Sequence, residues 1–198
     1  MKQLIGVVIL AMSLVLTTAH ATDGPREVVE QASREMLSAL QANQAALAQN
    51  PEQIYDLVQS ILLPHFDFQR MSQWVMGQHW RQASAAQREE FIDRFRTLLV
   101  NTYGKALLDY SSETVVFPDA PPPSGNDVTV RSEVQQRTGA PIPINYRLHN
   151  RDGNWKVYDV SVEGVSLVTN YRSQIDSLVR QEGIDGMLRK LNADNLES

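Results

Sequence analysis

The pattern of apolar and polar residues changes its period partway along the chain. Between Pro25 and Leu107 apolar side chains recur every three or four positions, which is typical of amphipathic helices. From Glu113 onward apolar and polar residues alternate, as they do in strands that bury one face. Beyond Gly164 the helical spacing returns. Helices, then an antiparallel meander, then helices again predict an α+β fold.

Proline and glycine mark the bounds of the first three expected helices. Pro25 and Pro51 each stand near the start of an apolar periodic run, where a helix tolerates proline. Pro64 ends the second run and Gly77 ends the third. The Ala- and Gln-rich stretch 41–49 is weakly apolar, and we expect it to continue the first helix with little burial.

A fourth helix is expected to begin at Ser84. Ser84 and Gln87 have the spacing of a capping box, in which each side chain bonds the other residue's backbone N–H. The helix then presents a wide aromatic face that includes Phe91 and Phe95. From the width of this face we expect the helix to lie across a sheet.

Four strands are expected in the alternating part of the chain. They are residues 114–117, 128–136, 142–148 and the strand that begins at Trp155. Arg151–Asn154 has the composition of a hairpin turn between the last two strands. A curved sheet of about four antiparallel strands wrapped by helices forms a cone. Such a cone is either filled by its own side chains or partly open as an apolar pocket, and the pattern leaves both possibilities open.

The first 21 residues have the three parts of a secretory signal peptide. Lys2 supplies the positive start, an apolar run extends from Leu4 to Leu16, and Ala19-His20-Ala21 has the form of a cleavage site. The run is short for a membrane-spanning helix, and a retained anchor is the alternative interpretation. We therefore expect cleavage after Ala21, which leaves residues 22–198 as a single exported domain.

Charge and cysteine content restrict the function further. The whole chain has a formal charge of −5, and removal of Lys2 with the signal makes the mature charge −6. This acidity argues against nucleic-acid binding and against simple adhesion to anionic lipid surfaces. The sequence contains no cysteine, which excludes disulfides, thiol catalysis and cysteine-based metal sites.

Catalytic and metal-binding motifs are missing from the sequence. We find no nucleophile elbow, zinc-protease motif, phosphate loop or dinucleotide fingerprint. His65, His79 and His149 lack metal-ligand spacing with one another, and His65-x-Asp67 is interpreted as a polar link between aromatic residues. Asp159 inside the last strand is the remaining candidate general base. The alternative is a carboxylate that faces solvent or that bonds neighbouring backbone or an arginine.

A series of short motifs, in a fixed order, spans about residues 25–192. They are Phe66-Asp67-Phe68, Met71-Ser72, Val75-x-Gly77-x-x-Trp80-Arg81-x-Ala83-Ser84, Gln87-Arg88-x-x-Phe91, Leu98-Leu99-x-x-Thr102-Tyr103, Trp155-Lys156-Val157-Tyr158-Asp159-Val160, Glu163-Gly164-Val165-Ser166-Leu167 and Asn170-Tyr171-Arg172. Each motif alone is weakly specific. In this order and spacing the chain resembles the MlaC family, also called the toluene-tolerance auxiliary proteins.

The resemblance implies a fold like the cone-shaped nuclear-transport-factor folds, with a deep apolar pocket. It implies a monomeric periplasmic carrier that needs no cofactor and holds a glycerophospholipid as cargo. The implied role is to shuttle lipid between the outer and inner membranes in the pathway that maintains outer-membrane lipid asymmetry. The implied partners are an outer-membrane lipoprotein associated with porins and an inner-membrane ABC transporter with a ring of MCE domains.

Residue parity and the family outline together predict which side chains line the lipid pocket. The predicted lining residues are Leu98, Thr102, Tyr103, Leu107, Val130, Val134, Ile144, Tyr146, Val157, Val165 and Val168. Ordinary core packing is the alternative for each of them. Arg81, Arg147 and Arg172 are candidates to meet a headgroup or a partner, with a solvated arginine as the alternative. Two competing functions stay open: an enzyme of the same cone fold that uses Asp159, and an adaptor with a filled core.

Overall fold

The computed structural model describes residues 23–109, 113–119 and 124–191, so the predicted signal peptide at 1–21 lies outside the described residues. The helices are α1 (Pro25–Ala42), α2 (Gln44–Gln49), α3 (Ile54–Leu57), α4 (Phe68–Met76), α5 (His79–Gln82), α6 (Ala85–Gly104), α7 (Ala106–Asp109) and α8 (Leu167–Leu191). Three short helical turns, η1 (Pro51–Gln53), η2 (Val58–Leu62) and η3 (Leu63–His65), flank α3. The strands are β1 (Thr114–Val116), β2 (Asp127–Gln135), β3 (Ile142–Arg151), β4 (Asn154–Val162) and β5 (Val165–Ser166).

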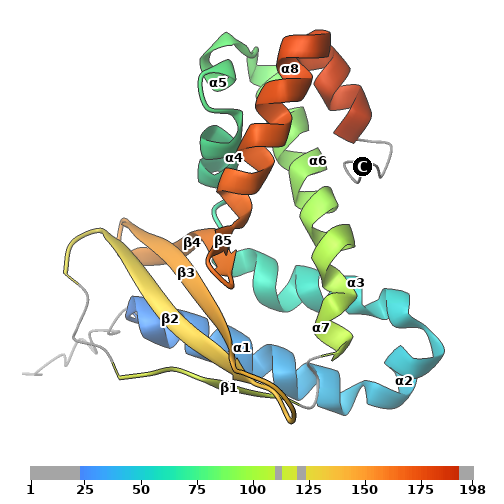
Figure 1. The fold of residues 1–198 in the computed structure, drawn as a ribbon, viewed down its shortest axis with the longest axis vertical. Coiled ribbons are helices and arrows are strands. Elements are labelled where there is room, and N and C mark those ends of the chain that lie inside the picture. The colour runs from blue at the N-terminus through green and yellow to red at the C-terminus, as the bar shows by residue number, and fades with distance from the viewer. Residues whose placement is uncertain (1–22, 110–112, 120–123, 192–198) are drawn as a thin grey trace, which may run out of the picture.

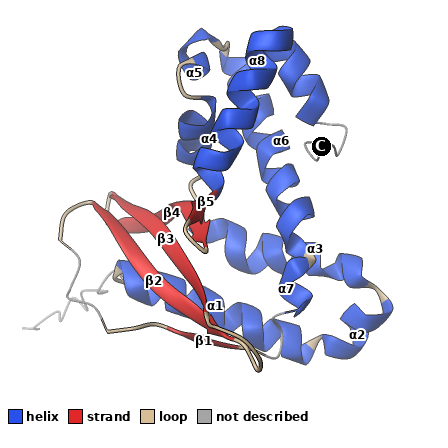
Figure 2. Cartoon of the chain, viewed as in Figure 1, coloured by secondary structure: helices blue, strands red, loops and turns tan. Residues whose placement is uncertain are grey.

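The strands form one open antiparallel sheet in the order β1-β2-β3-β4-β5 (Figure 2). The predicted α+β class and antiparallel pairing are confirmed, but the sheet has five strands rather than four. The additional strand follows from a two-residue turn at Glu163 and Gly164, whose φ angles are 51° and 85°. This turn folds Val165 back onto Val162 before α8 begins, so Val165 lies in a strand and not on the helix.

Two halves of the molecule meet at β4 (Figure 1). The helical half consists of α4, α5, α6 and α8, which pack together, and the sheet half consists of the sheet with α1 on one face. The expectation that the fourth helix, α6, lies across the sheet was wrong. Its aromatic face packs within the helical half, where the Phe95 ring meets the Tyr171 ring edge-on at 5.4 Å. The helix that covers the sheet is α1.

A β-bulge in β4 joins the two halves. Leu148 pairs with Val157, but the preceding residue Arg147 pairs with Asp159, so Tyr158 is an extra residue in β4. Val157 therefore points toward α1, and both Tyr158 and Asp159 are available to the helical half. Burial agrees, because Val157 belongs to the cluster under the sheet and Tyr158 to the helical core.

Several local predictions are confirmed by backbone geometry. Ser84 and Gln87 form both bonds of the capping box at the start of α6. Gly77 ends α4 with a φ of 53°, a conformation that favours glycine. Asp152 and Gly153, both at positive φ, form the two-residue turn between β3 and β4. Gly183, with a φ of 71°, interrupts α8.

In the part of the chain that the structure describes, no helix is both long and apolar enough to cross a bilayer.

Candidate functional site

The structure distributes the predicted lining residues over different parts of the molecule. Val130 and Val157 are buried in the cluster between α1 and the sheet, with Tyr146 half-buried beside them. Leu98 and Val168 belong instead to the core of the helical half. The others are Val134 (buried on β2), Ile144 (half-buried on β3), Leu107 (half-buried near α3), and Thr102, Tyr103 and Val165, which are exposed. Of the eleven predicted residues, Val130, Tyr146 and Val157 lie together in the cluster under the sheet. Their contact with lipid stays a prediction.

Tyr146 connects α1 to the sheet. Its hydroxyl forms side-chain hydrogen bonds with Ser132 on β2 and Ser33 on α1. Burial raises the pKa of Tyr146, and these two hydrogen bonds act in the opposite direction. The phenol is therefore a neutral polar contact in the space under the sheet.

A cleft of about 990 Å³ opens between α3, the start of α4, α6 and the β3–β4 hairpin. Its apolar lining residues are Tyr55, Leu63, Pro64, Phe66, Phe68, Ile92 and Val100. Its polar lining residues are Gln59, Asp67, Gln69, Arg96, Thr97, Asn101, Arg151 and Lys156. None of the eleven predicted residues lines this cleft. Its size is at the upper end of the roughly 300–1,000 Å³ that small-molecule sites occupy. We call it the large cleft.

One row of α6 forms a wall of the large cleft. Ile92, Arg96 and Val100 are four residues apart and therefore lie on one side of the helix. Further along α6, the backbone at Gly104 lies so close to the Tyr55 ring that an added Cβ would stand 3.0 Å from it. This close approach holds the end of α6 against α3. Nothing in the sequence pattern indicated that this row borders a space.

The inner wall of the large cleft lies where the hydrophobic clusters meet. Phe66 packs against both the helical core and the cluster under the sheet. Leu63 packs against the helical core and against a third buried cluster, which consists of Met36, Leu40, Leu47, Ile54 and Val58. The backbone of Phe66 also forms an isolated bridge with Val157, and Lys156 donates a hydrogen bond from Nζ to the Pro64 carbonyl at 2.5 Å. The segment from Leu63 to Phe66 is therefore fixed to β4.

The charges that line the large cleft are mostly positive. Its lining contains Arg96, Arg151 and Lys156, but Asp67 is its only carboxylate. Oxygen Oδ1 of Asp67 accepts the backbone N–H of Arg70 at 2.8 Å and Oδ2 bonds Nε2 of His149 at 2.8 Å, so both oxygens are already bonded.

Next to the cleft, burial is the main reason that the pKa of His65 is lowered, and Lys156 lowers it further. His65 is therefore neutral at neutral pH, and the positive charge comes from the arginines and the lysine.

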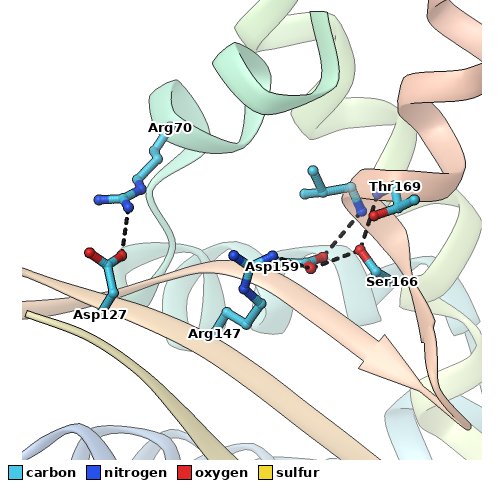
Figure 3. A network of polar contacts seen from close by, with 7 residues as sticks. Arg70, Asp127, Arg147, Asp159, Ser166 and Thr169 are labelled. Atoms are coloured by element: carbon cyan, nitrogen blue, oxygen red, sulfur yellow. Dashed lines mark hydrogen bonds and ion pairs between the residues drawn. The ribbon is translucent and has the colours of Figure 1, made fainter. Parts of the chain in front are cut away.

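A smaller cleft of about 410 Å³ adjoins the large one, and the two share Asp67, Gln69 and Arg151. The other residues that line it are Arg70, Gln73, Trp74, His149 and Asn150. Arg70 is ion-paired with Asp127 at 2.6 Å (Figure 3). The smaller cleft is thus mainly polar, with Trp74 as an exposed apolar side chain.

The contacts of Asp159, the candidate general base, indicate a structural role (Figure 3). Its Oδ2 accepts a hydrogen bond from Ser166 Oγ at 2.7 Å, and its Oδ1 accepts the backbone N–H of Val168 at 3.2 Å. Arg147 Nη1 lies 3.6 Å from Oδ2. The carboxylate is 1% exposed and lines neither of the two clefts. Its contacts hold the first turn of α8 to the sheet, which corresponds to the alternative role of a carboxylate bonded to backbone and arginine.

Among residues 23–109, 113–119 and 124–191, no three His, Asp or Glu side chains are arranged to hold a metal ion. The buried histidines His79 and His149 instead pair with Asp176 and Asp67, each at 2.8 Å.

The chain is similar over most of its length to proteins named for phospholipid transport and toluene tolerance. The profile of the family described as MlaC protein matches residues 30–193. The chain is 30% identical over 187 residues to the intermembrane phospholipid transport system binding protein MlaC of Haemophilus influenzae, covering 92% of this chain and 87% of that protein. It is 32% identical over 179 residues to the toluene tolerance protein ttg2D of Pseudomonas putida, covering 90% and 82%.

A solved structure of a Ralstonia solanacearum protein has the same fold. That phospholipid-binding protein was solved in complex with a phospholipid. It superposes with a TM-score of 0.80 at 28% identity, covering 87% of this chain and 97% of that one.

Proposed function

The chain belongs to the MlaC protein family, and on this premise we propose that it is a periplasmic carrier of glycerophospholipids. Transport between the inner and outer membranes is supported by the name of the Haemophilus influenzae relative, and lipid binding by the phospholipid in the Ralstonia solanacearum structure. The single observation of this chain that carries the proposal is the large cleft, which combines seven apolar lining residues with a volume of about 990 Å³ and a polar, mostly basic remainder.

The energetics of lipid transfer require such a site. Each methylene moved from water to an apolar environment gains about 0.8 kcal/mol, so tails with about thirty methylenes would cost on the order of 24 kcal/mol to expose. A lipid therefore crosses an aqueous space only inside a carrier. If the site is about as apolar as the bilayer, exchange is nearly balanced, and the direction of transfer must come from the partners.

The proposed partners are a lipoprotein–porin complex at the outer membrane and an ABC transporter with an MCE-domain ring at the inner membrane. Together with these partners, the carrier would maintain outer-membrane lipid asymmetry. The acidic chain supports dependence on partners, because a formal charge of −5 opposes unassisted adhesion to anionic bilayers. In this proposal residues 1–21 are removed during export, the domain 22–198 acts as a monomer, and the protein uses no metal or cofactor and performs no reaction.

We place the acyl tails in the large cleft. The alternative location is the space under the sheet, which is bordered by the predicted residues Val130, Tyr146 and Val157. In the large cleft, side chains such as Ile92, Val100 and Phe68 already border open space. Under the sheet, α1 would have to separate from the strands before two tails could enter.

Native mass spectrometry tests the proposal directly. The protein is purified from the periplasm without detergent, and a second aliquot is extracted with organic solvent. We expect a mass increment that is recovered as phospholipid. A bare-chain mass, with no uptake from added phospholipid vesicles, would overturn the carrier proposal and favour an adaptor with a filled core.

Two tryptophan variants test the location. Val100→Trp extends a bulky side chain into the large cleft from a half-buried position, so we expect loss of bound lipid with little change in unfolding free energy. Val134→Trp is the matched control under the sheet, where Val134 is 4% exposed and overpacking costs about 1–3 kcal/mol. If Val134→Trp alone abolishes lipid binding in folded protein, the tails lie under the sheet and the predicted lining residues are favoured.

A further inference from the structure

The two faces of the β3–β4 hairpin differ in chemistry. Side chains alternate between faces along a strand, so Tyr146 and Leu148 point toward α1 while the residues between and beyond them point away. The face that points away carries Arg147, His149 and Arg151 on β3 and Lys156 on β4, where Lys156 pairs with His149. A row of basic side chains therefore faces the two clefts and the helical half.

The basic residues of this row differ in what they contact. Arg147 lies over the rings of Trp74 and Tyr158 and beside Asp159, and His149 is bonded to Asp67. Lys156 donates one hydrogen bond to the Pro64 carbonyl and makes no ion pair in the described part of the chain. Arg151 makes neither a side-chain hydrogen bond nor an ion pair with any described residue.

Arg151 and Lys156 stand where a lipid headgroup would leave the apolar site. Both line the large cleft, and Arg151 also lines the smaller polar cleft next to it. The one carboxylate that lines the large cleft, Asp67, accepts the Arg70 backbone N–H and bonds His149, and it forms no ion pair with Arg151 or Lys156. A ligand with apolar tails in the large cleft would therefore present its phosphate to two basic side chains that lack an acidic partner.

We propose that Arg151 and Lys156 form a headgroup subsite that favours phospholipids with a net negative headgroup over zwitterionic ones. This inference rests on the proposed carrier function and adds the class of cargo. The headgroup of phosphatidylglycerol contains no cation, so its phosphate gains the full attraction of both side chains. A phosphatidylethanolamine carries an ammonium that neutralises its phosphate and is repelled by Arg151. Because exposed ion pairs are weak, the preference is expected to be about three- to tenfold.

A competition experiment measures this preference. Full mature protein is equilibrated with excess vesicles of equal phosphatidylglycerol and phosphatidylethanolamine with identical tails, then separated, and its lipid is extracted and quantified. Wild-type protein is expected to hold phosphatidylglycerol in about three- to tenfold excess, and the excess should shrink at high salt. The double variant Arg151→Gln/Lys156→Gln keeps side-chain length, and it should hold the same total lipid at a ratio near one.

A matched control comes from β2. Arg131 is exposed on the same sheet and lines neither of the two clefts, so Arg131→Gln changes the net charge by as much as Arg151→Gln or Lys156→Gln alone, but it should leave the lipid ratio unchanged, whereas each of those single variants should lower it. An equal effect of Arg131→Gln would overturn the subsite, because it would assign the preference to overall charge. A wild-type ratio near one, or a double variant that keeps the wild-type ratio, would also overturn it.

The same experiment separates failure of the subsite from failure of the carrier proposal. If wild-type protein takes up no lipid at all, the carrier proposal fails, whereas uptake without preference rejects only the subsite. Titration of lipid-free protein with inorganic phosphate distinguishes a lipid headgroup from a free anion. Phosphate binding that the double variant removes, combined with a lipid ratio near one in wild type, would assign the two residues to a free anion and overturn the lipid assignment.

Discussion

The helical half and the sheet half bury their apolar side chains to different extents. Most members of the helical core are fully buried, including Met71, Phe91 and Phe95, which are 0–1% exposed. Under the sheet only a few members are fully buried, and the others are half-buried, among them Tyr146 and Trp155. Four helices surround the helical core, whereas α1 is the helix that packs against the apolar face of the five-stranded sheet.

The dimensions of the elements explain this difference. A helix is about 10 Å wide and strands are spaced about 4.8 Å apart, so one helix covers about two strands. The rest of the apolar sheet face lacks a complete cover. The comparison indicates that the helical half is the rigid frame of the protein and that the less completely packed regions, at the sheet and between the halves, can accommodate a ligand.

Truncating one aromatic side chain in each half should give the largest difference in unfolding free energy. Phe95→Ala removes a fully buried ring from the helical core, and such changes cost about 3–5 kcal/mol of unfolding free energy. Trp155→Ala, in the sheet half, removes a larger ring that is only half-buried, and the expected cost is about 1–2 kcal/mol. Urea denaturation of both variants measures the difference. Equal losses would show that the two halves are equally well packed.

The connection between the halves is tested at Asp159. Asp159→Ala removes the acceptor of the Ser166 hydroxyl and the Val168 N–H, and a buried donor left without a partner costs about 1–3 kcal/mol. Asp159→Asn is the matched control, because its amide oxygen can still accept one of these bonds. We expect the order wild type, Asn, Ala in unfolding free energy. If Asp159→Ala unfolds at the same urea concentration as wild type, the carboxylate does not hold α8 to the sheet.

The local structure of both halves was largely predictable from the sequence. Alternation correctly predicts that Val130, Ser132 and Val134 are buried, because parity determines which side chains share a sheet face. The capping box at Ser84 and the turn at Gly153 are likewise determined by a few neighbouring residues. These features depend on contacts that are close in sequence.

Two arrangements between distant elements were not predictable. Both α1 and α6 have an apolar face, and nothing in their periodicity decides which of them covers the sheet. The bulge at Tyr158 was not predictable either, because it is defined by the register between β3 and β4, which the pattern of a single strand does not specify. The large cleft was not predictable either, because it depends on how α3, α4, α6 and the β3–β4 hairpin are placed relative to one another. The periodicity of each element does not specify that placement.

A smaller effect is expected at the cap of α6, which lies entirely in the helical half. Ser84 accepts the backbone N–H of Gln87 at 3.2 Å, and loss of such a cap costs about 1 kcal/mol. Ser84→Ala should therefore lower the unfolding free energy by about that amount, and Ser84→Gly by only a few tenths. Because the cap is remote from both clefts, native mass spectrometry should show unchanged lipid content. Loss of lipid in folded Ser84→Ala would mean that the frame and the ligand site are coupled.

The smallest expected effect is on the pH dependence of stability, and it concerns the helical half alone. The hydrogen bond from His79 is the main reason that the pKa of Asp176 is lowered below its usual 3.8, with Arg180 adding to the shift. An acid whose pKa is lower in the folded state stabilises the fold fully above its unfolded pKa, and this contribution is lost as pH falls through the folded value. His79 and Asp176 join α5 to α8 within the helical half, so the amount of bound lipid at neutral pH should not depend on this pair.

Urea midpoints measured between about pH 5 and pH 2 test this linkage. His79→Ala lowers stability at every pH, because His79 is a buried side chain, but its midpoint should fall less steeply than that of wild type below pH 3.8. Asp176→Asn removes the titrating group and keeps a hydrogen-bond acceptor for His79, so it should show the same shallow slope at higher overall stability. Parallel curves for wild type and both variants would mean that acid sensitivity originates elsewhere.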